Sequence, residues 1–83
     1  MIPKIIHYCW FGGNPLPEKL KHYIATWSIY CPDYEIKEWN EETFEVNSNE
    51  FTKTAYEHRK WAYVSDYVRA YALYHEGGIY LDT

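Results

Sequence analysis

The sequence predicts an α/β domain, a three-layer arrangement in which helices cover both faces of a short parallel sheet. Three observations support this fold class. Residues 5–11 form a short, nearly continuous apolar run that ends at Gly12-Gly13, which is typical of a strand buried on both faces. Helical and strand-like segments then alternate along the chain. A last helical segment stops at Gly77-Gly78, and a further apolar strand follows it.

The first helix is expected to begin near Pro17, because proline is well tolerated in the first helical turn, and to end at Pro32. Residues 34–39 have a partly alternating pattern of apolar and charged side chains, which indicates a second strand. A helix between two strands predicts a β-α-β unit with a right-handed crossover. Four side chains at helical spacing would form the buried stripe of this helix: Leu20, Ile24, Trp27 and Cys31.

The second half of the chain is expected to be mainly helical. Ser48 or Asn49 can cap a helical stretch that runs to Glu76 and is either continuous or broken near Lys60. Residues 79–81 then form the third strand. The expected order of strands across the sheet is second, first, third.

The carboxyl ends of these strands are the expected place for a ligand. In open α/β sheets, ligands bind beyond the carboxyl ends of the strands, where the strand order reverses. Trp10 and Phe11 end the first strand and Asp82 ends the third, so all three are expected side by side on that edge.

Composition and charge narrow the class of protein. With 47% hydrophobic and 20% aromatic residues in 83, the chain is too apolar for a disordered segment, and some aromatic surface should stay exposed. That surface would be covered by further sequence or by a second copy, giving a homo-oligomer. The net charge of −4, without a basic run, argues against a nucleic-acid partner. No apolar run is long enough to predict a transmembrane segment, and the first residues lack the charged and apolar regions of a signal peptide, so a cytoplasmic location is expected.

Asp66 and Arg69 lie three residues apart on a predicted helix and therefore share a face. Alone, such a pair is most simply a surface ion pair that contributes under about 1 kcal/mol. The alternative is a carboxylate for sugar hydroxyls beside a guanidinium for a hydroxyl or phosphate. Small and apolar residues nearby, Ala62, Ala70 and Leu73, suggest that this face turns inward.

Three further sets of residues could have a role in binding or catalysis. Trp10 is either a core residue or a platform on which a nucleobase stacks. Asp82 is either a turn residue or a ligand for Mg²⁺ or Mn²⁺, which prefer hard oxygen atoms. The histidines show no shared metal spacing, and His7 is best interpreted as a core residue.

Three segments together resemble the glycosyltransferases that use a nucleotide-sugar donor and an Asp-any-Asp (DXD) motif. This family includes capsular-polysaccharide transferases and the glucosylating domains of large clostridial toxins. The resemblance spans essentially the whole chain. It lies in Ile2-Pro3-Lys4-Ile5-Ile6-His7 with Trp10-Phe11-Gly12, in Ala62-Tyr63-Val64-Ser65-Asp66-Tyr67-Val68-Arg69, and in Gly77-Gly78-Ile79-Tyr80-Leu81-Asp82-Thr83.

The resemblance implies a nucleotide-diphospho-sugar transferase fold of the GT-A type and retention of the anomeric configuration. It assigns Trp10 to the donor base, which would be uridine or guanosine, with a UDP-sugar preferred. It assigns Asp66 to donor ribose or sugar hydroxyls and Arg69 to the donor sugar. Asp82 would be the first acid of the motif, touching the donor and Mn²⁺ or Mg²⁺. A saccharide acceptor and a role in polysaccharide or capsule biosynthesis also follow from the resemblance.

The second acid of the motif would follow Thr83, the last residue of the sequence. Residues 1–83 are therefore expected to be the N-terminal donor-binding part of such a domain, truncated inside the motif, with no complete catalytic set and little or no turnover alone. Two alternatives remain open. One is a module that binds nucleotide sugar without catalysis, and the other is a self-associating fragment.

Overall fold

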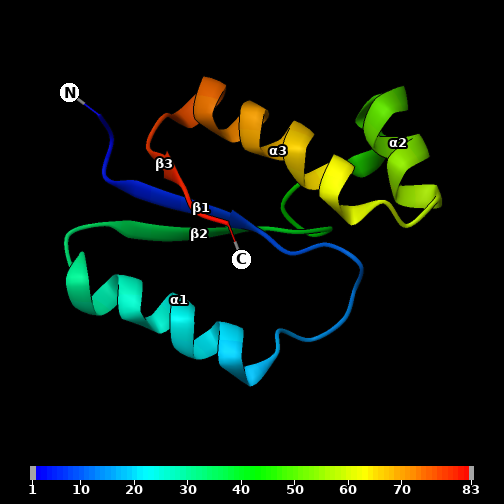
Figure 1. The fold of residues 1–83 in the computed structure, drawn as a ribbon. Coiled ribbons are helices and arrows are strands. Elements are labelled where there is room, and N and C mark those ends of the chain that lie inside the picture. The colour runs from blue at the N-terminus through cyan, green and yellow to red at the C-terminus, as the bar shows by residue number, and fades with distance from the viewer. Residues whose placement is uncertain (1, 83) are drawn as a thin grey trace.

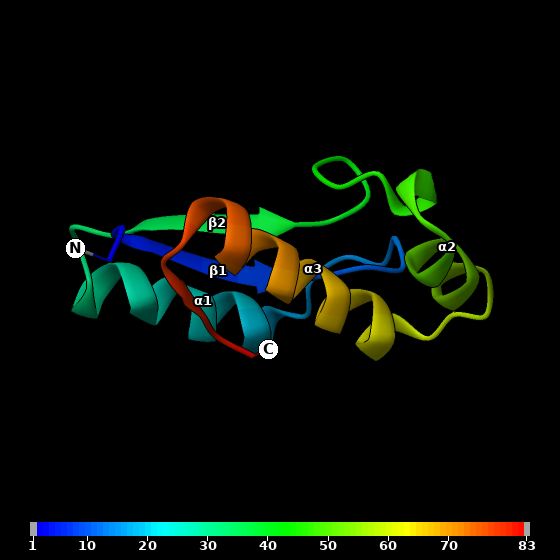
Figure 2. The same cartoon turned by 90° about the horizontal axis from the view of Figure 1, so that it is seen from above.

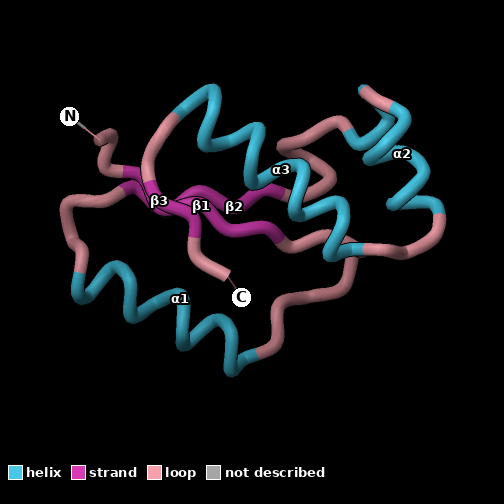
Figure 3. Tube along the Cα trace, turned by 45° about the horizontal axis from the view of Figure 1, so that its top comes forward, coloured by secondary structure: helices cyan, strands magenta, loops and turns pink. Residues whose placement is uncertain are grey.

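The computed structural model describes residues 2–82 and shows three layers (Figure 1). Three parallel strands form a sheet of order β2-β1-β3. Helix α1 covers one face of the sheet and α3 covers the other, while α2 packs against α3 beyond the carboxyl ends of the strands (Figure 3). The predicted α/β class and strand order are confirmed. The elements are β1 (Ile5–Cys9), α1 (Glu18–Tyr30), β2 (Glu35–Trp39), the 3₁₀ helix η1 (Val46–Ser48), α2 (Glu50–Glu57), α3 (Trp61–Glu76) and β3 (Ile79–Tyr80).

Strand β1 lies in the middle of the sheet and is buried on both faces, as its unbroken apolar run predicts. Ile6 and Tyr8 point to the α1 face, where they pack with Trp27. Cys9 points to the α3 face, where it packs with Val64 and other residues. This alternation follows from the period of two in a β-strand.

The amount of buried apolar surface differs between the two faces. On the α1 face, three residues are fully buried, and Trp27 is the only one that α1 contributes. On the α3 face, nine residues are buried together, including Val64, Val68 and Ala72 from α3. Of the stripe predicted for α1, Ile24, Trp27 and Cys31 belong to this cluster, with Trp27 alone buried, whereas Leu20 is only half-buried.

The face of α3 that packs against the sheet is not the face that the sequence predicts. The face that carries Asp66 and Arg69, with Ala62 and Leu73, is exposed in this chain rather than turned inward. The sheet is contacted by Val64, Val68 and Ala72 instead. Valine and alanine are smaller than leucine and tyrosine, so they let the helix axis approach the strands closely. Because α3 has few charged residues, its sequence pattern does not single out one face.

The helix boundaries have local causes. The Asn49 side chain caps α2 by accepting a hydrogen bond from the Thr52 N–H at 2.9 Å. Helices α2 and α3 are separate, and Arg59 between them has a left-handed φ of 57°. The break expected near Lys60 is thus present.

The Gly77-Gly78 turn leads from α3 into β3. Gly78 has a φ of 94°, and a Cβ atom there would lie 2.5 Å from the Ile5 carbonyl oxygen. Only glycine allows β1 and the end of α3 to approach this closely.

Across residues 2–82, every helix is too short or too polar to cross a membrane.

Candidate functional site

The carboxyl ends of the strands meet at one edge of the molecule, together with the β1–α1 loop, the β2–η1 loop and α2 (Figure 2). Strands β1 and β2 run in register up to Cys9 and Trp39, and the Trp10 N–H continues the ladder by donating to the Trp39 carbonyl at 2.9 Å. Beside β1, the Leu81 N–H donates to the His7 carbonyl at 3.0 Å, so β3 delivers Asp82 to the same edge. This is the edge that the sequence predicts for a ligand.

Arg69 and Asp82 are brought together around Tyr80 and Cys9. The Arg69 guanidinium carbon lies 5.7 Å from the centre of the Tyr80 ring, a cation–π contact. Arg69 and Asp82 both act electrostatically on the Cys9 thiol and on the Tyr80 hydroxyl. The side chains at this corner thus come from three elements: β1, α3 and the end of β3.

Burial keeps the Cys9 thiol and the Tyr80 hydroxyl protonated. Burial raises the pKa of the Cys9 thiol from 9.0 to about 11, and the nearby Tyr80 hydroxyl, the Ser65 carbonyl and Arg69 offset only part of that effect. Burial also raises the pKa of Tyr80, and the neighbouring Cys9 and Asp82 raise it further. Both groups therefore keep their protons at neutral pH. Cys9 is a packing residue here rather than a nucleophile.

Asp66 lies one helical turn before Arg69, on the same exposed flank of α3. Within residues 2–82, neither Asp66 nor Arg69 takes part in a salt bridge. The expectation of a simple surface ion pair between them is therefore not met. Their carboxylate and guanidinium groups remain available for a ligand.

Trp10 approaches the edge from the opposite side of the sheet. Its ring is partly buried against the α1-face cluster, which Leu81 also contacts. Its indole N–H donates to the Asn14 carbonyl at 2.7 Å, which orients the ring within its own loop. The predicted donor residues thus wrap around the sheet edge, with Trp10 on the α1 side and Arg69 on the α3 side. Phe11, expected beside them, is buried in the α3-face core.

A metal centre is not complete within the described residues. Asp82 is exposed and offers oxygen atoms of the kind that Mg²⁺ and Mn²⁺ prefer. However, no group of three or more His, Cys, Asp or Glu side chains in residues 2–82 is arranged to hold a metal ion. One carboxylate does not make a binding site for such an ion.

The sequence analysis missed several carboxylates at this edge. Glu38 accepts a hydrogen bond from the Tyr8 hydroxyl at 2.5 Å and another from the Asn40 side chain. Burial, followed by the hydrogen bond and charge of Glu38, raises the pKa of Tyr8. Glu41 accepts from the Gly12 N–H at 2.6 Å. A cavity of about 350 Å³ lies between these groups, lined by Trp10, Gly13, Asn14, Glu38, Asn40, Glu41, Glu42 and Tyr56.

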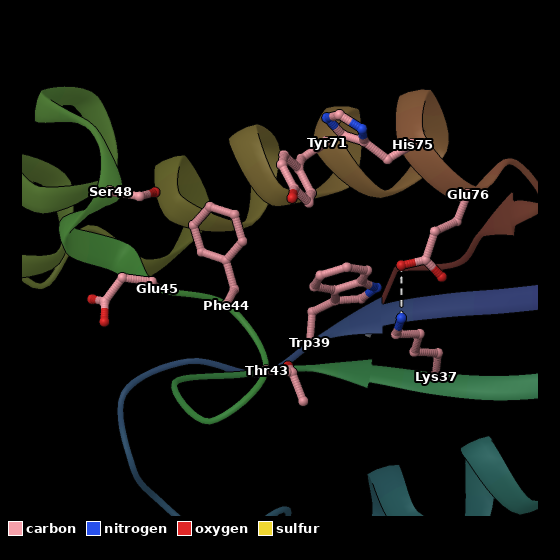
Figure 4. Close-up of a pocket in the computed structure, with 9 residues that line it drawn as sticks. All are labelled: Lys37, Trp39, Thr43, Phe44, Glu45, Ser48, Tyr71, His75 and Glu76. Carbon is pink, nitrogen blue, oxygen red and sulfur yellow. Dashed lines mark hydrogen bonds and ion pairs between the residues drawn. The ribbon is translucent and has the colours of Figure 1, made fainter.

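A second cavity, of about 670 Å³, lies on the other flank of α3 (Figure 4). Trp39, Phe44 and Tyr71 contribute aromatic rings to its walls, and an ion pair of 2.7 Å between Lys37 and Glu76 bounds one end. Tyr71 lines it two residues after Arg69, which is about 200° around a helix. None of the predicted donor residues lines this cavity, so we place the candidate site at the sheet edge, where the chemistry-bearing groups meet. The cavity is lined by Lys37, Trp39, Thr43, Phe44, Glu45, Ser48, Tyr71, His75 and Glu76.

In an α/β domain of this kind, the carboxyl ends of the parallel strands are the edge at which ligands bind. Comparison with known protein families identifies the family to which the chain belongs. The sequence model of the family described as "glycosyltransferase sugar-binding region containing DXD motif" matches residues 17–83. The chain belongs to this glycosyltransferase family. Its three-stranded parallel sheet is compatible with part of a GT-A-type domain.

A curated relative supports the assignment. Inositol phosphoceramide mannosyltransferase 3 of Schizosaccharomyces pombe is 38% identical over 89 residues, an alignment that covers 98% of this chain. The chain spans 24% of the length of that relative. No solved structure matches the chain at a significant level.

Proposed function

We propose that this chain supplies the donor-binding part of a glycosyltransferase that moves a sugar from a nucleotide-sugar donor to a saccharide acceptor. The observation that carries the proposal is the meeting of Arg69 and Asp82 around Tyr80 at the carboxyl edge of the sheet, with Asp66 one turn away. The reaction transfers a glycosyl group with retention, as the family resemblance implies.

Each side chain has a role that suits its chemistry. The Arg69 guanidinium offers several N–H donors in a plane and suits the hydroxyl or phosphate oxygens of a donor. The Asp66 carboxylate accepts hydrogen bonds from sugar or ribose hydroxyls. The Trp10 ring stacks on the base, a contact that contributes about 1–3 kcal/mol. Asp82 would supply one oxygen ligand for Mn²⁺ or Mg²⁺.

We propose a UDP-sugar as the donor and polysaccharide synthesis as the setting. The yeast relative, which is named as a mannosyltransferase, adds mannose as a second candidate sugar. GDP-mannose is therefore the comparison donor in the experiment below.

The test is a ¹H–¹⁵N NMR titration of the 83-residue chain with UDP-glucose and Mg²⁺, and in parallel with GDP-mannose and Mg²⁺. Shifts should cluster on Trp10, Asp66, Arg69 and Asp82. Arg69→Met should abolish them, whereas Arg59→Met, which removes an exposed guanidinium between α2 and α3, should not. If a well-folded sample responds to neither donor, or if the shifts lie elsewhere, the proposal is wrong.

Self-association is the second candidate function. It is favoured by the exposed aromatic side chains of α2 and α3, among which Phe51, Tyr63 and Tyr74 are 54%, 56% and 86% exposed. Sedimentation at increasing protein concentration would reveal it as a rising mass. A constant monomer mass would exclude it.

A further inference from the structure

Glu41 connects three segments at the carboxyl edge of the sheet. One of its oxygen atoms, Oε2, accepts the Gly12 N–H at 2.6 Å and the Tyr56 hydroxyl at 3.0 Å. Gly12 belongs to the loop after β1, Tyr56 to α2, and Glu41 itself to the loop after β2. A bond of this length from a backbone N–H to a carboxylate is charge-assisted and therefore stronger than an ordinary amide bond.

The loop that carries Glu41 is itself firmly held. The Asn40 side-chain oxygen accepts the Glu42 N–H at 2.9 Å, and the Asn40 carbonyl accepts the Thr43 and Phe44 N–H groups at 3.1 and 2.9 Å. These bonds close a tight turn directly at the end of β2. The turn thus holds the backbone of Glu41 at the end of β2, and the Glu41 side chain can restrain the groups that it binds.

The Gly12 backbone is held on its other side by an indole ring. A Cβ atom at Gly12 would lie 3.0 Å from the Trp61 ring, so the two are in close contact. Gly12 has a φ of 112°, a conformation that other residues rarely adopt. The Tyr56 and Trp61 rings pack edge to face with centroids 5.1 Å apart. Gly12 is therefore in contact with both the Glu41 carboxylate and the Trp61 ring.

The Tyr56 hydroxyl keeps its proton and remains a donor to Glu41. Burial, then the hydrogen bond and the charge of Glu41, raise the pKa of Tyr56. The carboxylate therefore has two donors on one oxygen atom, one from the backbone and one from a side chain.

The same loop determines the orientation of Trp10. The Trp10 indole N–H donates to the Asn14 carbonyl at 2.7 Å, which closes the loop across Gly12. Gly12 lies inside this closure, so a change in its position is expected to alter the geometry at Trp10 and Asn14. We propose that Glu41 is a positioning residue, which holds the loop after β1 so that the Trp10 ring is preset in the orientation offered to the donor base. The reference to a donor base rests on the proposed function.

The experiment compares the chain with Glu41→Ala, Glu41→Gln and Glu42→Ala by ¹H–¹⁵N NMR without donor. Glu42 is the exposed neighbouring carboxylate and serves as the matched control. In Glu41→Ala, the Gly12 amide proton should move upfield and the Trp10 indole N–H signal should move with it. Glu41→Gln keeps an oxygen acceptor without the charge, so it should restore the Trp10 signal and leave a smaller upfield shift at Gly12. Glu42→Ala should change neither signal.

The inference is wrong if the Gly12 signal of Glu41→Ala moves while its Trp10 signal stays in place, or if Glu41→Ala and Glu42→Ala behave alike. If Glu41→Ala does not fold, Glu41→Gln decides the question, because an unmoved Gly12 amide in that variant would show that no charge-assisted bond exists there.

Donor titrations of the same variants separate the two proposals. If the unaltered chain binds UDP-glucose or GDP-mannose, Glu41→Ala should weaken that binding about tenfold, as expected when a hydrogen bond to a charged group is lost. If the unaltered chain binds no donor, the proposed function is wrong, and the donor-free spectra still decide whether Glu41 positions Trp10.

Discussion

The two faces of the sheet are stabilised in different ways. On the α1 face, one large ring, Trp27, fills the space between helix and sheet, with the Tyr8 and Tyr23 rings packed edge to face against it. On the α3 face, nine apolar residues share the contact, and two buried polar side chains, His7 and Thr52, lie on the same side of the sheet. The first face depends on a single anchor, whereas the second depends on many small contacts and on polar partners.

The comparison matters because the candidate site draws on both faces. Trp10 is packed against the α1-face cluster, and Arg69 lies against Tyr80 on the α3 face. A disturbance of either face should therefore move one half of the site and spare the other. The following predictions test this difference, beginning with the largest expected effect.

Replacing the single anchor of the α1 face should have the largest effect. Trp27→Ala leaves a large cavity between α1 and the sheet and should lower the free energy of unfolding by about 3–5 kcal/mol. Urea unfolding followed by circular dichroism measures this. Tyr30→Ala removes an aromatic ring from the same helix that is 82% exposed, and it should be nearly neutral. Similar losses in the two variants would show that the α1 face has no single anchor.

Alkaline pH should destabilise the α3 face through Cys9. The pKa of Cys9 is raised from 9.0 to about 11, so the folded chain keeps this proton between these pH values while the unfolded chain loses it. Stability is therefore full below pH 9 and falls as the pH rises to 11, by about 3 kcal/mol for a shift of this size.

Urea midpoints between pH 8 and 11 measure this decline. Cys9→Ala should flatten it, although the raised pKa values of Tyr8 and Tyr80 leave part of it in place. Cys31→Ala, the control at the other free cysteine, should follow the unaltered chain. Parallel curves for Cys9→Ala and the unaltered chain would contradict the assignment.

The buried hydrogen bond between Trp39 and His7 should give a smaller effect. The Trp39 indole N–H donates to His7 Nδ1 at 2.9 Å, so Nδ1 carries no proton and Nε2 donates to the Gly77 carbonyl at 2.7 Å. Trp39→Phe leaves Nδ1 buried without a donor and should cost about 2 kcal/mol.

The ring ¹⁵N shifts of His7 identify the tautomer before and after this change, and urea unfolding gives the cost. Trp61→Phe makes the same change of ring size at a half-buried indole, and it should lower the free energy of unfolding by a smaller amount. If the two changes cost the same, ring volume rather than the hydrogen bond accounts for the loss.

The fold was largely predictable because its signals are local. The apolar run of β1, the proline at the start of α1 and the Gly77-Gly78 stop each act on neighbouring residues, and the structure places all three as expected. The inward face of α3 was not predictable in the same way. Apart from Asp66, Arg69, His75 and Glu76, this helix is built of alanine, valine, tyrosine, leucine, tryptophan and serine, so the side that packs is chosen by its fit to the sheet.

The site was predictable only where it resembles a motif. Arg69 and Asp82 were proposed from such patterns, and the structure brings them together around Tyr80. Glu41 was not foreseen, because its bond to Gly12 joins residues 29 positions apart and depends on how two loops meet. A glutamate in a polar stretch carries no local sign of such a role.

The bond from His7 to Gly77 has a consequence for how the protein is made. It joins residues 70 positions apart, and β3 pairs only with β1, beside Ile6 and His7. On the ribosome, β1, α1 and β2 leave the tunnel first and can assemble, while one edge of β1 stays unpaired until β3 has been synthesised. An unpaired strand edge can add a strand from another chain. During synthesis, this half-built sheet therefore presents an unpaired strand edge at which misassembly can begin.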